Sequence, residues 1–412
     1  MISKKTSHTR QKSLYLISQS DHAGGAAIAT NRIFHCLKNA GLRVEWLVGQ
    51  RSEINDLNIK EINPLMKVLS SLYSKIDWRV CRLIDSNNLE LQTSGFFGVL
   101  RAKKINELSF DLINIHWIGH GFMSLKQLSK IKKPLILTMH DEWFLHPISH
   151  YKNNPASTNV NCLFEFLCNS IKRYILSRKF QILNKDNVFI VCPSKQLASK
   201  FRAQFPNKQE RILYIPNPVN LNEFYPEKKA QFNGLSAEGI GLPVIFFLGG
   251  TKNSRKGFDL LEDALEQIEF PFILLIIGNS ARLSYGKFSQ IKVVNIRKVY
   301  AVEDLRKLYS LSHLVVVPSR DEAGGPQTAT EALSCGTPVV GFNTGSLQDI
   351  VQSNFTGELV SDFNSTELSK AIMKVLFNKK SQYSDNCRFI AKESFSFEKV
   401  RNDYLTLIES KF

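Results

Sequence analysis

Short apolar runs alternate with stretches of helical period along most of the chain. Stretches such as 26–38 and 194–205 have the spacing of helices with one buried face. The apolar runs are short and nearly uninterrupted, as expected for strands covered on both faces of a sheet. In the first half we predict strands at residues 13–18, 43–48, 111–116, 134–139, 188–192 and 211–215. This alternation predicts an α/β fold with a parallel, doubly wound sheet.

Three segments interrupt the alternation. Residues 64–105 and 152–187 are predicted to be helical insertions, and the second of them is basic. The run Pro216-Asn217-Pro218 ends any regular element, because proline fixes φ and lacks an amide hydrogen. The polar residues 219–242 then have the composition of a linker.

The alternation restarts after this linker and predicts a second domain of the same class. We predict strands at 244–248, 272–277, 292–295, 314–317 and 338–341, with helices at 256–268, 302–311, 328–335, 366–377 and 397–407. The chain is expected to form two Rossmann-like domains, 1–218 and 243–395, that face each other across a cleft. Residues 396–412 are expected to form a C-terminal helix, and packing back on the first domain is one option for it. Ligands of such sheets bind at the carboxyl ends of the strands.

Length and composition are those of a globular protein with more than one domain. The chain has 412 residues, of which 43% are hydrophobic and 22% charged. Its apolar runs are far shorter than the roughly 20 residues that span a bilayer, and residues 14–17 are too short a run for a signal-peptide core. The seven cysteines are scattered without a CxxC, which disfavours a disulfide framework or a zinc ribbon. A cytoplasmic location is the default expectation.

The positive charge of the chain lies entirely in its first half. The formal net charge is +16, and residues 1–220 contain 31 Lys and Arg against 15 Asp and Glu, whereas residues 221–412 contain 22 of each sign. Such a field attracts polyanions or an anionic membrane surface, although a basic surface without a partner is the simpler alternative. Nucleic acid is disfavoured, since the chain has no zinc-finger spacing, RNP-like aromatic motif or basic tail.

Glycines follow the first predicted strand and open the next helix. Gly24 and Gly25 would let backbone amides approach an anion at the start of that helix. The sequence around them is not GxGxxG, so it does not indicate a dinucleotide site or a nicotinamide dehydrogenase. The alternative is a tight turn without a ligand.

Histidines follow two neighbouring predicted strands of the first half. His116 and His120 follow one strand, and His140 with Asp141 follows the next. A histidine at a strand end can donate a hydrogen bond to a phosphate or a sugar hydroxyl, and an adjacent carboxylate can fix its tautomer. A metal site made of the three histidines is disfavoured, because no carboxylate lies at a fixed spacing. The alternative is a set of loop-capping histidines.

A second glycine-rich turn, at residues 249–257, follows the first strand of the second half. Arg255 and Lys256 lie near the start of a predicted helix, where they oppose the helix dipole unless an anion binds there. Together with the glycines they predict a clamp for a diphosphate. The run lacks the order of a Walker A loop, and a solvated charged loop is the alternative.

The longest motif of the chain is the segment 318–340. An acidic loop precedes Gly325, and the following helix would expose the amides of Gln327 and Thr328 to phosphate oxygens. Glu331, one turn into that helix, is placed to accept hydrogen bonds from the vicinal hydroxyls of a ribose. Helix capping by acidic residues is the alternative.

Taken in order, these motifs resemble those of retaining glycosyltransferases of the GT-B fold, in glycosyltransferase family 4. The run Leu-Thr-Met-His-Asp-Glu-Trp at 137–143 most resembles members that build bacterial exopolysaccharide, capsule or O-antigen. The resemblance is collinear over nearly the whole chain and runs through Gly24-Gly25, His116-Trp117, 133–143, Pro193-Ser194-Lys195, 215–219, Arg255-Lys256-Gly257, 318–340 and 395–404.

The resemblance implies transfer of a sugar from a nucleotide-diphosphate-sugar, with retention at the anomeric carbon. The donor would lie against the second domain and the acceptor against the first. Members of the family need no metal and no cofactor, since the nucleotide-sugar is a substrate. The resemblance implies a role in catalysis for His140, Glu322 and Lys256. It implies donor binding by Gly24, Gly25, Lys252, Arg255, Lys256, Gly325, Gln327, Thr328 and Glu331. The remaining strand-end residues, His116, His120 and Asp141, are candidates on the acceptor side.

Two positions depart from the family pattern. The family usually has two acids separated by seven residues, but Ala323 occupies the first position and Glu322 lies one residue earlier. Either Glu322 or Asp321 could take the role of the first acid. Where the family often has a cation after the first glycine of the second domain, this chain has Gly250, so Lys252 is the substitute candidate.

The resemblance leaves the acceptor and two rival functions open. The acceptor would be a saccharide or a polyprenyl-diphosphate-linked saccharide at the inner face of the membrane. Basic residues among 1–12 and at Lys126, Lys130, Lys132 and Lys133 would contact anionic lipid there. The rivals are a sugar-nucleotide epimerase of the same fold, and a catalytically silent subunit that binds a nucleotide-sugar.

Overall fold

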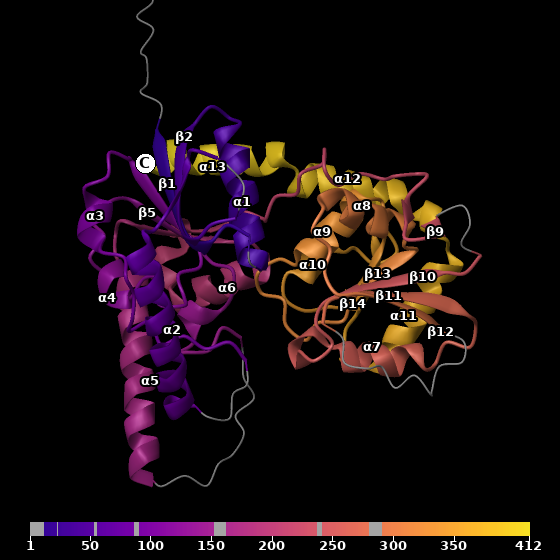
Figure 1. Ribbon diagram of the computed structural model, residues 1–412, viewed down its shortest axis with the longest axis horizontal. Coiled ribbons are helices and arrows are strands. Elements are labelled where there is room, and N and C mark those ends of the chain that lie inside the picture. Colours follow the sequence, from indigo (N-terminus) through magenta and orange to yellow (C-terminus); the bar gives the residue numbers. More distant parts are fainter. Residues whose placement is uncertain are drawn as a thin grey trace, which may run out of the picture. The chain divides into compact units, whose positions relative to one another are not determined.

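The chain forms two compact units in the computed structural model (Figure 1). The structure describes residues 12–22, 24–52, 56–85, 90–151, 162–236, 241–279 and 291–412. The first unit comprises Met1–Val191, Phe205–Leu213 and Arg401–Phe412. The second comprises Cys192–Gln204 and Tyr214–Val400. The last residues of the chain therefore belong to the first unit, and residues 192–204 belong to the second.

The first unit is built on a seven-stranded sheet with the order β3-β2-β1-β4-β5-β6-β7. Its strands are β1 (Ser13–Ser20), β2 (Arg43–Gln50), β3 (Ile59–Glu61), β4 (Leu112–Ile115), β5 (Leu135–Thr138), β6 (Val188–Cys192) and β7 (Ile212–Tyr214). All residues of β1, β4, β5 and β6 are buried, which explains why these strands are mostly apolar. Because the strands around β1 are parallel, their carboxyl ends meet at one edge of the sheet.

Helices of very different lengths surround this sheet. They are α1 (Gly25–Lys38), α2 (Pro64–Ile84), α3 (Ala102–Asn106), α4 (Leu125–Leu128), η1 (Trp143–Leu145), α5 (Cys162–Leu183) and η2 (Pro206–Arg211). The long helices α2 and α5 pack against each other (Figure 1). The side chain of Asn63 caps α2 by accepting from Met66 N at 2.8 Å, and Pro64 occupies its first turn. Residues 152–161 of the predicted second insertion lie outside the described residues.

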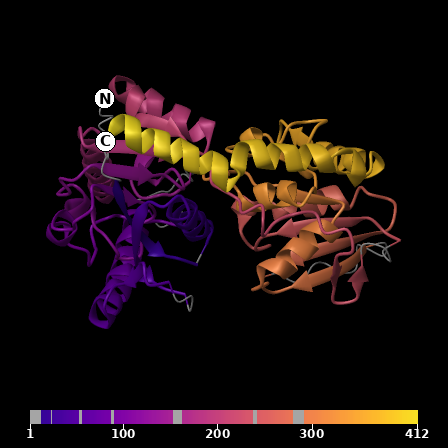
Figure 2. The same cartoon turned by 90° about the horizontal axis from the view of Figure 1, so that it is seen from above.

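The last helix of the chain, α13 (Phe397–Lys411), continues from the second unit into the first. Within the first unit Tyr404, Leu407 and Ile408 are buried. The C-terminal end of this helix lies in the first unit (Figure 2). The ring of Phe412 packs edge-on against Phe189 of β6, with 4.7 Å between centroids. The carboxyl-terminal residues therefore complete the core of the first unit.

The second unit contains a six-stranded parallel sheet with the order β12-β11-β10-β13-β14-β15. Its strands are β10 (Val244–Leu248), β11 (Phe272–Ile277), β12 (Ile291–Ile296), β13 (Leu314–Val317), β14 (Val339–Phe342) and β15 (Gly357–Val360). Its remaining elements are α6 (Lys195–Gln204), η3 (Ser254–Lys256), α7 (Phe258–Leu265), α8 (Val302–Leu311), α9 (Gln327–Ser334), α10 (Leu347–Ile350), α11 (Ser365–Phe377), η4 (Lys380–Gln382) and α12 (Ser384–Phe395). Helices α7 and α11 pack together, and α9 packs against α8 and α12 (Figure 1).

Two segments of the second unit differ from the sequence-based expectation. The predicted helix 256–268 is divided, because Gly257 has φ 65° and α7 begins only at Phe258. Part of the expected linker contributes to the hydrophobic core through Val219, Phe224 and Ala230. It also forms the two-stranded hairpin β8 (Gln231–Phe232) and β9 (Leu235–Ser236). A few apolar anchors in a polar segment are enough to fix it against the unit.

Among the described residues, no helix combines the length and the apolar character needed to cross a bilayer.

Candidate active site

The two histidines at neighbouring strand ends of the first unit contact each other directly. His116 follows β4 and His140 follows shortly after β5, and these strands pair in parallel with Ile115 opposite Leu137. His116 Nδ1 lies 2.9 Å from His140 Nε2, and the two rings stack with 5.2 Å between centroids. The shared edge of the sheet thus places both imidazoles in one site.

Burial keeps this histidine pair neutral at physiological pH. Loss of water lowers the pKa of His140 to about 4, although Asp141 opposes the shift. Burial and the neighbouring His140 lower the pKa of His116 well below its ordinary value. A neutral imidazole carries one N–H, so one ring donates to the other.

The surroundings of His116 decide which ring donates. Its Nε2 is buried without a hydrogen-bond partner. An unpaired buried N–H costs more free energy than an unpaired lone pair, so we assign the proton of His116 to Nδ1. His140 then accepts at Nε2 and carries its own proton on Nδ1. The partly exposed His140 is therefore a hydrogen-bond donor of fixed tautomer.

Asp141 is committed to the loop that follows β5. Its Oδ1 accepts from Trp143 N at 2.9 Å, and its Oδ2 lies 2.6 Å from His150 Nδ1. His150 Nε2 in turn lies 3.0 Å from Thr93 Oγ1. Burial raises the pKa of Asp141, but His150, the amide of Trp143 and His140 together outweigh it, and the net pKa is below its ordinary value. These contacts surround a small pocket lined by His116, Trp117, His140, Asp141, His150 and Thr93, among others.

Lys179 of α5 braces the same loop and was not identified from the sequence. Its side chain is fully buried, and Nζ donates to the carbonyl oxygens of Trp143, His146 and Pro147 at 2.6, 2.8 and 2.9 Å. The ammonium also lies 3.7 Å from the centroid of the Trp143 ring. Burial lowers the pKa of Lys179 well below its ordinary value, against an opposing effect of Asp141. A lysine in the middle of a basic helix gives no sequence signal for such a role.

The third predicted histidine lies apart from this pair. His120 occupies a turn with φ 54° against α2, where its Nδ1 lies 3.3 Å from Ser74 Oγ and its carbonyl accepts from Ser70 Oγ at 2.9 Å. Within the described ranges, no group of three His, Cys, Asp or Glu side chains could hold a metal ion. The predicted acceptor-side role of His120 stays a prediction.

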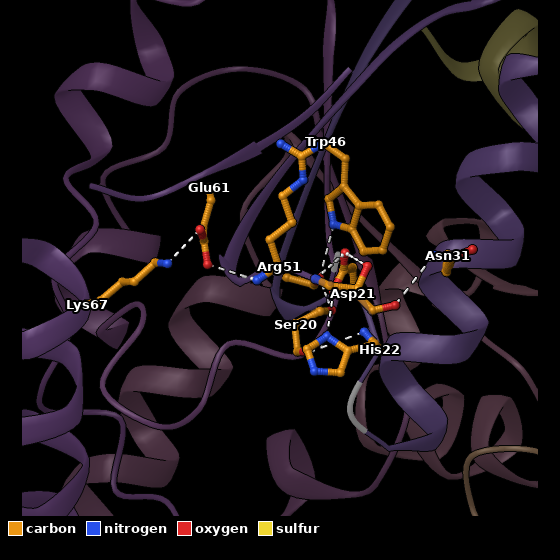
Figure 3. Close-up of polar contacts among 10 residues, drawn as sticks. Ser20, Asp21, His22, Asn31, Trp46, Arg51, Glu61 and Lys67 are labelled. Atoms are coloured by element: carbon orange, nitrogen blue, oxygen red, sulfur yellow. Dashed lines mark hydrogen bonds and ion pairs between the residues drawn. The ribbon is translucent and has the colours of Figure 1, made fainter. Parts of the chain in front are cut away.

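The glycine-rich loop before α1 is held at its start by a buried carboxylate. Asp21 accepts from Ser52 N and Ser52 Oγ, both at 2.8 Å, and lies 2.7 Å from His22 Nδ1 (Figure 3). Gly24 has φ 88°, a conformation that side chains rarely adopt, and the positions of a Cβ on Gly24 or Gly25 would be open. Helix α1 has no acidic residue in its first turn, so its positive end is not compensated there. The role of Gly24 and Gly25 beside phosphates stays a prediction.

Polar contacts extend from this loop to the start of α2 (Figure 3). Arg51 N donates to Glu61 Oε1 at 2.9 Å, and Glu61 forms an ion pair with Lys67 of α2 at 2.5 Å. Trp46 Nε1 donates to Ser18 Oγ at 3.0 Å beneath the loop. The carboxyl ends of β1, β2 and β3 are thus joined by one polar network.

The second unit brings the predicted clamp cations to a single carboxylate. Lys256 Nζ lies 2.5 Å and Arg255 Nη1 3.7 Å from Glu322 Oε1, and Arg255 Nη1 also donates to Asp321 O at 2.8 Å. Burial raises the pKa of Glu322, but Lys256 and Arg255 lower it by more, so its net pKa is below the ordinary value. Glu322 is therefore an ionised, buried partner of both cations. Lys252 is exposed on the preceding turn.

A close backbone approach holds the two clamp loops together. A Cβ on Gly257 would lie 1.9 Å from Pro318 O, so only glycine fits between the loops. Arg320 reinforces this contact by donating to Ser254 O at 2.6 Å and pairing with Asp259 through both carboxylate oxygens. The cations and Glu322 are thereby positioned by two rigid turns.

Helix α9 begins beside this clamp motif with its first turn open. Neither a capping side chain nor an acidic residue is present in that turn, so the amides of Gln327 and Thr328 form the positive end of the helix. The loop before it is fixed by Asn217 Nδ2, which donates to Gly324 O at 2.6 Å, and by Gly325 N, which donates to Ser346 Oγ at 2.9 Å. Asn217 lies in the Pro216-Asn217-Pro218 run, so the sequence drew attention to its position. No sequence motif pointed to Ser346.

Glu331 lies one turn into α9 and is buried. Its Oε2 accepts from Tyr309 OH at 2.8 Å. Burial and the neighbouring Glu331 raise the pKa of Tyr309 well above its ordinary value, so the phenol remains a donor. Tyr309 therefore orients the carboxylate, and ribose binding by Glu331 stays a prediction.

Comparisons with known proteins identify the family. The model for "Glycosyltransferase Family 4" matches residues 23–223, and the model for "Glycosyl transferases group 1" matches residues 236–393. Two parallel α/β sheets with these matches define a GT-B glycosyltransferase. The chain belongs to glycosyltransferase family 4, whose members retain the configuration of the transferred sugar. The family and fold expected from the sequence are thus confirmed.

Curated relatives match over most of their length. An uncharacterized glycosyltransferase of Methanocaldococcus jannaschii is 27% identical over 304 residues, which cover 72% of this chain and 74% of the relative. A D-inositol 3-phosphate glycosyltransferase of Xylanimonas cellulosilytica is 24% identical over 82% of this chain and 80% of its own. An uncharacterized protein from the cps region of Klebsiella pneumoniae is 23% identical over 78% of this chain and 85% of its own length.

Solved structures share the fold at low sequence identity. Sucrose-phosphate synthase from Thermosynechococcus elongatus matches with a TM-score of 0.69 and 20% identity, covering 97% of this chain and 99% of that one. Anabaena HepE in complex with UDP-glucose matches with a TM-score of 0.62 and 16% identity, covering 97% of this chain and 99% of HepE. At these identities the likeness shows the GT-B fold alone.

Proposed function

We propose that the chain transfers a sugar from a nucleotide-diphosphate-sugar to a saccharide or a lipid-linked saccharide during the synthesis of a cell-surface polysaccharide. The observation that carries the proposal is the clamp of the second unit. Two cations of the turn 249–257 pair with a buried carboxylate of the segment 318–340, and the open end of α9 follows that carboxylate in the same segment. The relative from a cps region supports the polysaccharide pathway.

The clamp suits the leaving group of such a reaction. Breaking the bond between sugar and diphosphate leaves negative charge on phosphate oxygens, and fixed cations and amides stabilise it without reorganisation. We assign this role to Lys256, Arg255, Gln327 and Thr328, with Glu331 on the ribose. Because HepE is solved with UDP-glucose, UDP-sugars are the first donors to test.

The histidine pair suits recognition of an uncharged group. His140, with its proton on Nδ1, would donate a hydrogen bond to a hydroxyl of the transferred sugar. His116 would act through His140 and would not contact the acceptor itself, because its ring is buried and paired. Glu322 would hold Lys256 and Arg255 in place and would face the hydroxyls of the donor sugar.

The donor site can be tested by binding before an acceptor is known. A thermal-shift screen of nucleotide-sugars on the full chain identifies the best donor, and the Lys256→Ala and Glu331→Ala variants are then titrated with it. Both should bind more weakly, by about tenfold or more for each lost charged hydrogen bond. Lys370→Ala is the matched control, because Lys370 is an exposed cation of the same unit paired with exposed Glu367. If both test variants bound the donor like the wild type, the clamp assignment would be wrong.

The reaction itself is tested by donor consumption. Transfer requires an acceptor, whereas an epimerase converts the donor alone, and a silent subunit would bind the donor without converting it. We expect donor consumption to rise with an added saccharide acceptor, and nuclear magnetic resonance of the product to show a retained anomeric configuration. Donor conversion that is independent of any acceptor would contradict the proposal.

A further inference from the structure

The longest helices of the first unit, α2 and α5, expose an unusual amount of apolar surface. On α5 Phe164, Leu167, Ile171 and Tyr174 are between 38% and 57% exposed. Their spacing of three, four and three residues places them in one stripe along the helix. Large apolar patches on a soluble protein mark an interaction surface.

Helix α2, which packs beside α5, also exposes apolar side chains. Leu65, Val68 and Leu72 are 51% to 78% exposed and again follow a helical stripe, and Trp78 and Leu83 are exposed further along. The two helices meet where Cys168 Sγ lies 3.7 Å from Leu83 O. We call these nine exposed residues the paired-helix face: Leu65, Val68, Leu72, Trp78, Leu83, Phe164, Leu167, Ile171 and Tyr174.

The charges on the same two helices are almost all positive. Four basic residues of α2 and three of α5 are at least partly exposed, namely Lys67, Lys75, Arg79, Arg82, Lys172, Arg173 and Arg178. The only acidic residues of these helices are Asp77, which is buried, and Glu165. Such a surface repels a second copy of itself and attracts a negatively charged one.

We infer that the paired-helix face binds the surface of an anionic lipid bilayer. Leu and Phe would enter the acyl boundary, Trp78 and Tyr174 would lie at the headgroups, and Lys and Arg would contact anionic lipid. The inference differs from the contact surface predicted from the sequence, which placed the lysines of 126–133 against the membrane. It concerns association with the surface of the bilayer.

Both helices of this face are connected to the histidine pocket. Asp77, next to Trp78, accepts from Ser94 N at 3.2 Å and from Ser94 Oγ, and the adjacent Thr93 lines the pocket. Lys179 lies five residues beyond Tyr174, about 7–8 Å along the helix, and braces the loop after His140. The pocket is therefore close to the proposed lipid surface. This part rests on the proposed function, and it favours an acceptor with a lipid anchor over a free saccharide.

Vesicle binding of the full chain tests the inference without any assay of transfer. Vesicles of phosphatidylcholine alone are compared with vesicles of equal parts phosphatidylcholine and phosphatidylglycerol by sedimentation. We expect binding to the anionic vesicles only, with a Trp78 emission that shifts to shorter wavelength. Trp78→Phe should retain most of the binding and lose most of the shift. Equal binding to both vesicle types, or to neither, would overturn the inference.

Paired variants locate the surface. Lys75→Gln with Arg79→Gln should weaken binding to the anionic vesicles about 30-fold, as expected for two charges near a membrane. Phe164→Ser with Leu167→Ser should weaken it about tenfold. The matched control removes two exposed charges elsewhere on the same unit, in Lys126→Gln with Lys130→Gln, and should change binding less than threefold. If the control weakened binding and the paired-helix variants did not, the face would be wrongly assigned.

Two further readouts separate this inference from others. If light scattering showed that the paired-helix variants convert an oligomer to a monomer while vesicle binding is unchanged, a second copy would be the occupant and the inference would fail. Donor binding is measured on the same variants. Loss of vesicle binding with intact donor binding in the variants supports the inference. Absence of donor binding in a wild type that binds vesicles would contradict the proposed function alone.

Discussion

The histidine pocket of the first unit and the clamp of the second solve opposite electrostatic problems. Burial removes the charge from His116 and His140, leaving two neutral rings joined by one hydrogen bond. Burial also acts on Glu322, but Lys256 and Arg255 outweigh it and keep the carboxylate ionised. A neutral pair of fixed tautomer suits hydroxyl groups, whereas an ionic cluster with a helix end suits phosphate. The comparison shows that burial alone does not decide charge, because the immediate partners do.

The largest effect is expected from removing the clamp lysine. Lys256→Met should lower kcat/KM by about 10²–10³-fold, because a preorganised cation that stabilises the leaving diphosphate is lost. Steady-state kinetics with the best donor measure it, with Lys370→Met as the control. An unchanged kcat/KM would mean that the ionic cluster around Glu322 is only structural.

A buried lysine of the first unit and a half-buried lysine of the second allow the units to be compared directly. Lys179 donates to three carbonyls in the first unit, and Lys380 donates to the carbonyls of Ser310 and Ser312, with Tyr309 O at 3.4 Å, in the second. Lys179→Met and Lys380→Met should each lower the free energy of unfolding by about 3 kcal/mol, because buried carbonyls lose their donor.

Urea unfolding of the two lysine variants measures these losses. Only Lys179→Met should also change the fluorescence of Trp143, whose ring the ammonium contacts. If Lys179→Met were as stable as the wild type, the brace on the loop after His140 would be unimportant.

The neutral histidines predict a pH dependence of stability. An unfolded histidine titrates near pH 6.5, whereas His140 titrates near 4 in the fold, so the unfolded state binds more protons between these values. The contribution is complete above pH 6.5 and is lost as the pH falls towards 4. We expect a loss of about 2 kcal/mol between pH 6.5 and 5 from His140. Urea unfolding at each pH should show a flatter slope for His140→Phe, and an unchanged slope would contradict the assignment.

The smallest expected effect concerns the tautomer of His140. His116→Phe should lower kcat about tenfold with little change in donor KM, because His140 loses the partner that fixes its proton on Nδ1. His116→Asn should restore part of kcat, since the asparagine amide can donate from nearly the position of Nδ1. Equal kcat for the Phe and Asn variants would show that His116 only fills space.

Much of this arrangement could be predicted from local sequence. The buried strands β10 and β11 are unbroken apolar runs, and β1, β4 and β5 are mostly apolar; the ends of these strands locate His116, His140 and the turn at Gly249. The two segments of the clamp, 249–257 and 318–340, are each contiguous in the sequence and were recognisable by their residue order. Short elements such as β3 and β15 escaped prediction, because three or four residues carry too little periodic signal.

What the sequence could not supply were contacts between distant segments. The pairing of His116 with His140 depends on the sheet order, and the roles of Asp77 and Lys179 depend on insertions whose helices pack beside the sheet. Helix α12 buries Cys387, Ile390, Ala391 and Phe395. Small and polar residues between them hid this helical stripe from the sequence analysis. The polar segment 219–236 concealed its core residues Val219 and Phe224 in the same way.

The return of residues 401–412 to the first unit has a consequence for how the chain is made. The residues that close the core under β6, including Tyr404, Leu407 and Phe412, are synthesised after the whole second unit. The unit that is synthesised first must therefore wait for the whole second unit to emerge before it can complete its own interior. An isolated fragment ending before residue 401 would lack part of its core, and expressing the first unit alone would require those twelve residues to be joined to it.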